Sequence, residues 1–200
     1  MKILDGKKLS ERILNNLKRE IENRRLNLRL AVVLVGENPI SKIFINQKKK
    51  ACEKTGIDFK LIKFPAGINA AEFKKEIKKI VQNPVNSGII IQLPLSKKFL
   101  PEEFLNLIPE EKDIDVLSKK SFQKFAKRKL PILPPTVAAT AILLKKYRIK
   151  IKNKNIVIIG KGRLVGRPLA VWLKLQRAKF SVVEKNTKNI FSHIKKADIL

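Results

Sequence analysis

NIVIIGKGRLVGRPLAVWLKL (155–175) starts with β-branched residues, passes through three glycines and ends in a segment with apolar residues at helical spacing. The apolar run predicts a buried strand over 155–160, and the segment 164–175 predicts a helix. A second apolar run, KFSVVE (179–184), predicts a strand after that helix. Strand, helix and strand in this order form a βαβ unit, which indicates a parallel sheet covered by helices.

The glycines between the strand and the helix are typical of a phosphate-binding turn. Gly160 would permit the tight turn, Gly162 would let backbone approach a pyrophosphate, and Gly166 would allow close packing at the start of the helix. The spacing is G-x-G-x-x-x-G rather than the commoner G-x-G-x-x-G, so an ordinary strand-to-helix turn is the alternative. Glu184 ends the next strand, where an acid binds the adenosine ribose, and this favours a dinucleotide site.

The charges around this turn leave the phosphorylation of the dinucleotide open. The carboxylate of Glu184 repels a 2′-phosphate and favours NAD. Lys161 and Lys185 favour NADP, because lysine can hold a phosphate as a point charge.

The first half of the chain repeats the alternation of strand and helix. The pattern predicts strands at 28–36, 57–64 and 88–95, with helices at 9–21, 39–55 and 69–80. We therefore predict the α/β class, with a parallel-sheet domain at 1–130 and a Rossmann-type dinucleotide-binding domain at 131–200. The basic stretch 118–135 is expected to be an irregular linker, residues 136–147 a helix, and ADIL (197–200) the start of a further strand.

Charge is distributed unevenly along the 200 residues, whose formal net charge is +28. Residues 1–115 hold 23 basic and 15 acidic side chains, whereas residues 116–200 hold 22 and 2. Such a field attracts nucleic acid, phosphorylated cofactors or polycarboxylate substrates. Aromatic residues make up only 6% and do not alternate with basic ones, which disfavours nucleic acid.

Cysteine and histidine are too few for metal or disulfide chemistry. Cys52 and His193 are the only residues of their types, so no intramolecular disulfide and no zinc cluster are expected. No uninterrupted apolar stretch approaches a membrane span, and the first residues lack the pattern of a signal peptide. We expect no membrane partner and a cytoplasmic location.

Several segments together resemble one family in the same order. The matching segments are ILDGKKLSERI (3–13), VGENPISKIFINQKKKAC (35–52), GIIIQLPLS (88–96), PEEKDIDV (109–116) and GKGRLVGRP (160–168). The chain resembles the bifunctional methylenetetrahydrofolate dehydrogenase/methenyltetrahydrofolate cyclohydrolase family. The resemblance implies two α/β domains flanking a cleft, a tetrahydrofolate substrate, NADP with NAD as the alternative, no metal, and a homodimer.

The resemblance also implies roles for individual residues. Lys48 is the catalytic lysine of SKIFINQKKKAC (41–52), although a lysine on a helix is otherwise an ordinary solvated charge. Gln92 would fix the amine of Lys48, with a plain strand-end amide as the alternative, and Asp115 would bind the pterin, with a turn-forming carboxylate as the alternative. The substrate would also contact Phe44, Leu93, Pro94 and Leu95. The cofactor would contact Gly160, Lys161, Gly162, Arg163, Val165, Gly166, Glu184 and Lys185.

The chain departs from the family pattern at several positions. Phe44 replaces a tyrosine and lacks its hydroxyl, and Val116 replaces a glycine. Family members continue past ADIL, so we expect a C-terminally truncated chain. The alternative functions are an impaired homologue that acts as a folate-binding or scaffold protein and, less favoured, a nucleic-acid-binding protein.

Overall fold

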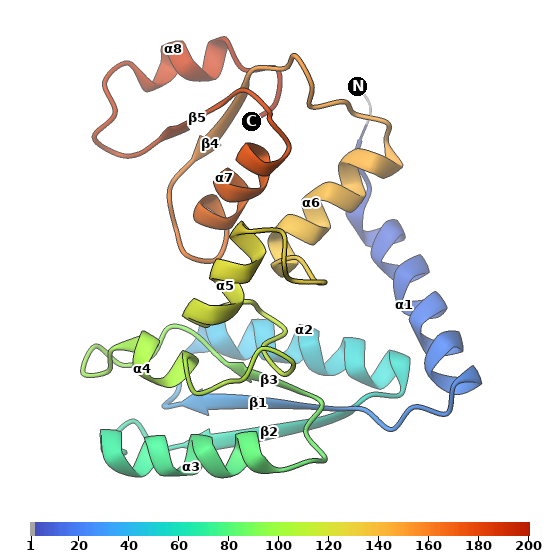
Figure 1. The fold of residues 1–200 in the computed structure, drawn as a ribbon, viewed down its shortest axis with the longest axis vertical. Coiled ribbons are helices and arrows are strands. Elements are labelled where there is room, and N and C mark those ends of the chain that lie inside the picture. Colours follow the sequence, from blue (N-terminus) through green and yellow to red (C-terminus); the bar gives the residue numbers. More distant parts are fainter. Residues whose placement is uncertain (1–2) are drawn as a thin grey trace. The chain divides into compact units, whose positions relative to one another are not determined.

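The computed structural model describes residues 3–200, which divide into two compact units. The first unit is Asp5–Ser121, and the second is Phe122–Leu200 together with residues 3 and 4. Each unit contains a parallel sheet with helices beside it (Figure 1), which confirms the predicted α/β class.

The first unit is built around a three-stranded parallel sheet of order β2-β1-β3. Its elements are α1 (Gly6–Asn23), β1 (Arg29–Val35), α2 (Pro39–Thr55), β2 (Asp58–Phe64), α3 (Ala70–Gln82), β3 (Gly88–Ile91) and α4 (Pro101–Leu105). The side chains of β1 alternate between two cores, because α3 and α2 cover opposite faces of the sheet (Figure 1). Val33 packs against the core that includes Phe73 of α3, and Val32 packs against the core that includes Ile45 of α2.

Local signals at both ends of α2 fix the helix that carries the predicted lysine. The side chain of Asn38 accepts the Ser41 N–H (3.0 Å), and Pro39 occupies the first turn. At the other end Gly56 adopts φ +79°, the left-handed conformation that glycine adopts without strain. The sequence around α2 therefore determines where the helix starts and ends.

The second unit contains a two-stranded parallel sheet, β4-β5. Its elements are α5 (Lys119–Ala126, which begins in the first unit), α6 (Pro135–Lys146), β4 (Ile156–Ile159), α7 (Gly166–Leu175), β5 (Phe180–Val183) and α8 (Ile190–Lys195). The strand predicted to start in ADIL is present as a single bridge, in which Ile199 pairs in parallel with Ile156. Among residues 3–200, no helix combines the length and apolar character needed to cross a membrane.

The irregular linker predicted at 118–135 is wrong over Lys119–Ala126, which form α5. The helix begins where the Ser118 hydroxyl accepts the Ser121 N–H (3.2 Å). Phe122 and Phe125 then stand one turn apart with their rings 5.8 Å apart between centroids. The density of lysines concealed this short amphipathic pattern. The helices α4 and α8 were likewise not predicted from the sequence.

Candidate active site

The amine of Lys48 is the first feature of the candidate site. Lys48 lies half-buried on α2, and its Nζ donates a hydrogen bond to Oε1 of Gln92 (3.0 Å). Its two neighbours in the lysine run are exposed, and the Nζ of Lys49 lies 3.7 Å from a carboxylate oxygen of Glu53. Helical geometry thus separates one lysine of KKK from the other two.

Gln92 is held rigidly at the carboxyl end of the central sheet. Its side chain is buried, at 7% exposure, and its backbone N–H donates to the Val33 carbonyl (2.8 Å). The side-chain Nε2 donates to the carbonyl of Leu93 (2.9 Å), which leaves Oε1 directed at Lys48. The amide therefore orients the amine by accepting one of its hydrogen bonds.

Asp115 brings a carboxyl group to the same place from a loop. Burial raises the pKa of Asp115 above its usual value; the nearby Lys48 amine works against this rise, and the Asp113 carboxylate adds to it. Lys48, Gln92 and Asp115 come from α2, the end of β3 and a loop, and the first unit brings all three together.

The other predicted substrate residues occupy different positions around this group. Phe44 lies one turn before Lys48 on the same side of α2, and 55% of it is exposed, so its ring is accessible to a flat ligand. Leu93 is half-buried and packs against the core, and Leu95 is buried in it. Pro94 is exposed and follows a cis peptide bond.

Asp113 was not predicted as a site residue, yet it is almost completely buried at 2% exposure. Its two carboxylate oxygens accept the N–H groups of Leu117 (3.1 Å) and Ser118 (2.9 Å). One feature of the sequence could have indicated this role: an aspartate that precedes a turn often accepts hydrogen bonds from backbone N–H groups a few residues later in the chain.

The glycine turn lies between β4 and α7 in the second unit. Gly160 follows β4 with φ +88°, and a Cβ on Gly166 would lie 2.0 Å from the Gly160 carbonyl oxygen. A Cβ added to Gly162 would meet no heavy atom within 4 Å, so backbone at this point is open to a ligand. The turn leads into the N-terminus of α7, with Lys161 and Val165 exposed and Arg163 half-buried.

The end of β5 lies beside this turn. Gly160 donates its N–H to the Val183 carbonyl (2.7 Å), which places the two strand ends together. A hollow there is lined by Gly160, Glu184, Lys185 and Asn186. Glu184 and Lys185 are exposed, so a carboxylate and an ammonium group are both accessible at this hollow.

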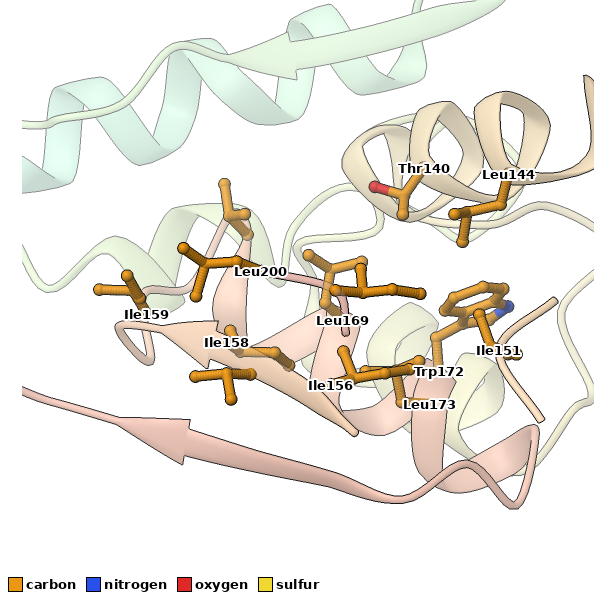
Figure 2. Close-up of a pocket in the computed structure, with 13 residues that line it drawn as sticks. Thr140, Leu144, Ile151, Ile156, Ile158, Ile159, Leu169, Trp172, Leu173 and Leu200 are labelled. Atoms are coloured by element: carbon orange, nitrogen blue, oxygen red, sulfur yellow. The ribbon is translucent and has the colours of Figure 1, made fainter. Parts of the chain in front are cut away.

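A second, apolar pocket of about 350 Å³ lies in the same unit, among α6, α7 and β4 (Figure 2). Its labelled lining residues, such as Leu144, Leu169 and Trp172, are apolar apart from Thr140. The lining carries no charged side chain, and the Thr140 hydroxyl donates to the Thr136 carbonyl (2.9 Å), so we assign the pocket no part in the chemistry. Among residues 3–200, no group of three or more His, Cys, Asp or Glu side chains could hold a metal ion.

Comparison with known families gives two matches along the chain. Residues 4–115 match the model described as tetrahydrofolate dehydrogenase/cyclohydrolase, catalytic domain. Residues 134–200 match the NAD(P)-binding domain of the same family.

Individual proteins are similar over the whole chain. The bifunctional protein FolD of Lactobacillus gasseri is 35% identical over 202 residues, covering 100% of this chain and 72% of the relative. The bifunctional protein FolD of Aquifex aeolicus is 37% identical over 203 residues, covering 99% and 70%. The crystal structure of the bifunctional FolD enzyme from Campylobacter jejuni aligns with a TM-score of 0.93 at 33% identity, covering 100% of this chain and 72% of that one.

Proposed function

The chain belongs to the tetrahydrofolate dehydrogenase/cyclohydrolase family, and we infer that it is a bifunctional enzyme of one-carbon metabolism. It oxidises 5,10-methylenetetrahydrofolate to 5,10-methenyltetrahydrofolate with a nicotinamide cofactor. It then adds water to the methenyl carbon to give 10-formyltetrahydrofolate and a proton. The observation that carries this conclusion at the residue level is the Lys48 amine, held 3.0 Å from Gln92 with the Asp115 carboxyl nearby.

We propose that Lys48 is the group that moves protons during hydrolysis. A half-buried amine on a rigid helix can hold a water molecule beside the methenyl carbon and transfer protons as that water adds. Gln92 fixes the direction of the amine, because its amide is itself held by buried backbone. Asp115 would accept N–H groups of the pterin, and Phe44 would stack on its flat ring system.

The cofactor is a nicotinamide dinucleotide, since residues 134–200 form an NAD(P)-binding domain. The residues present fit it: Gly162 leaves backbone accessible, and the N-terminus of α7 offers N–H donors. When bound, the nicotinamide ring accepts the hydride from the methylene bridge. We propose that Gly160, Lys161, Gly162, Arg163, Val165 and Gly166 cradle the phosphates, with Glu184 and Lys185 at the adenosine end.

We further propose that the protein prefers NADP to NAD as its dinucleotide. The exposed ammonium group of Lys185 supports this choice, because it can bind a 2′-phosphate and Lys161 adds to the positive charge, whereas Glu184 opposes it. The family resemblance supports three further assignments. These are folate binding by residues 1–130 with dinucleotide binding by 131–200, a homodimer, and a cytoplasmic location.

The function is tested by following both reactions spectrophotometrically with purified protein. We expect oxidation of 5,10-methylenetetrahydrofolate that depends on a nicotinamide dinucleotide, and hydrolysis of 5,10-methenyltetrahydrofolate without one. Tetrahydrofolate binding without either turnover would instead support the impaired folate-binding homologue. Absence of both binding and turnover would contradict the proposal.

The cofactor preference is tested at Lys185. We expect Lys185→Gln to raise the KM for NADP by about tenfold, because one charged contact to a phosphate is lost, and to change the KM for NAD much less. Lys188→Gln is the matched control, since it removes the same charge from the same segment without lining the hollow. If both variants raised the KM for NADP equally, Lys185 would act only through the overall positive charge of the protein and not through a contact with the 2′-phosphate.

A further inference from the structure

Val116 has an unusual backbone conformation next to the candidate active site. Its φ is +56°, in the left-handed region, and only 1% of the residue is exposed. A β-branched side chain in this region is a true outlier, because its Cβ substituents collide with the backbone. The other non-glycine residues with positive φ among residues 3–200 are arginines or asparagines: Arg25, Arg128, Arg148, Asn153, Arg177 and Asn189.

The segment before Val116 is anchored to the sheet and to α3. The Ile89 N–H donates to the Lys112 carbonyl (2.9 Å), and Ile89 pairs with Asp113 as an isolated bridge. The Lys112 side chain reaches the end of α3, where its Nζ donates to the carbonyls of Val81 (2.8 Å) and Asn83 (2.9 Å). The chain therefore enters the loop at a fixed place and in a fixed direction.

The segment after Val116 is held by Asp113 itself. Its two carboxylate oxygens bind the N–H groups of Leu117 and Ser118, and its carbonyl accepts the Val116 N–H (3.2 Å). The backbone must turn sharply to bring residues 117 and 118 back over residue 113. The left-handed conformation of Val116 makes this turn, and a buried carboxylate with two N–H partners is a strong local restraint.

We infer that Asp113 is a positioning residue, which holds Val116 in its left-handed conformation and thereby fixes Asp115 beside Lys48. The inference rests on the proposed function. Asp115 directly precedes Val116, so relaxation of Val116 to a negative φ would rotate the backbone next to Asp115 and move its carboxyl group. Strain of this kind persists in a fold only where surrounding contacts impose it, and it concentrates at functional sites.

A specific coupling between two substitutions is expected. In Asp113→Asn, one N–H acceptor becomes an amide donor, Val116 relaxes, and we expect kcat/KM for methenyltetrahydrofolate hydrolysis to fall by about 30-fold, chiefly through a higher KM. Val116→Gly by itself should stay within about threefold of the parent, because glycine adopts positive φ without strain. The double variant Asp113→Asn/Val116→Gly should recover to within about threefold of Val116→Gly, because the restraint is no longer needed.

Arg148→Gly is the matched control for added backbone freedom. Arg148 has the same φ of +56° but belongs to the second unit, so we expect Arg148→Gly to leave Asp113→Asn unrescued. Circular dichroism and urea unfolding of every variant identify any that fails to fold, and titration with tetrahydrofolate measures binding independently of turnover. Full activity in Asp113→Asn, or a double variant no better than Asp113→Asn, would overturn the inference. A parent protein that neither binds nor turns over folate would instead remove the proposed function, and this inference with it.

Discussion

At the scale of single residues, the site depends on the environment of one amine among many. The chain has 45 lysines and arginines, and three consecutive lysines occur at 48–50. Only the first of these three is half-buried and bonded to a buried amide, whereas Lys49 and Lys50 are exposed. Position on α2 and contact with Gln92, rather than residue type, are what make Lys48 suitable for proton transfer.

Asp115 provides a test of the charge placed in this site. Folding raises its pKa above the ordinary 3.8, so the native state holds the proton more tightly than the unfolded chain. The ionised carboxyl therefore destabilises the protein at neutral pH, and stability is regained as the pH falls through the folded pKa toward 3.8. We expect Asp115→Asn to stabilise the unliganded protein at about pH 7 by on the order of 1 kcal/mol, and to lose tetrahydrofolate binding.

Urea unfolding at about pH 7 and about pH 4 measures the effect. The gain in stability should be smaller at the lower pH, because the folded parent protein takes up the Asp115 proton more readily than the unfolded chain as the pH falls. Glu111→Gln, which removes an exposed carboxylate of the same loop, should show no such gain. A less stable Asp115→Asn at neutral pH would mean that attraction to Lys48 outweighs the burial of the carboxylate.

Some positions of the site residues follow from their spacing in the sequence. Phe44 and Lys48 share a helix face because they are four residues apart, and Gln92 directly follows the apolar strand β3. Asp113 could not be recognised in the same way, because its partners are backbone N–H groups of a turn. The positive φ of Val116 follows from that turn, and valine does not indicate it, whereas the glycine of the family pattern at this position does.

At the scale of elements, apolar runs and caps predicted the parallel strands and the helices that pack on them. β1 is apolar throughout its centre because α2 and α3 cover both faces, and this pattern is unambiguous in sequence. α5 was missed because its two phenylalanines lie among lysines. α4 and α8 were missed because they span five and six residues, too few for a periodic signal.

Two glycines of the turn between β4 and α7 have different expected roles, one in stability and one in cofactor binding. We expect Gly166→Ala to destabilise the protein by about 3 kcal/mol, because its Cβ would lie 2.0 Å from the backbone oxygen of Gly160. Gly162→Ala should change stability by less than about 0.5 kcal/mol, because nothing lies within 4 Å, yet weaken NADP binding by blocking the approach of the pyrophosphate. Urea unfolding and NADP titration measure the two effects. Equal loss of stability in both variants would contradict this division.

At the scale of the whole molecule, the charge distribution complements the proposed ligands. Residues 116–200 carry 22 basic and 2 acidic side chains, and they include the whole stretch that matches the NAD(P)-binding domain. A strongly positive field accelerates the encounter with an anionic dinucleotide, and salt weakens it. The positive charge alone does not show whether the protein binds a phosphorylated cofactor or a nucleic acid. The order of the family motifs along the chain favours the cofactor. The chain spans 72% of the length of the Lactobacillus gasseri relative, and it matches both family domains.

The central claim is that Lys48, oriented by Gln92, moves the protons of hydrolysis. The most direct measurement is the rate of 5,10-methenyltetrahydrofolate hydrolysis by Lys48→Met and Lys49→Met, assayed side by side with the parent protein. We predict that Lys48→Met loses about 100-fold or more, the usual contribution of a positioned acid–base group, whereas Lys49→Met retains the parental rate. An unchanged rate in Lys48→Met, or equal losses in both variants, would contradict the account.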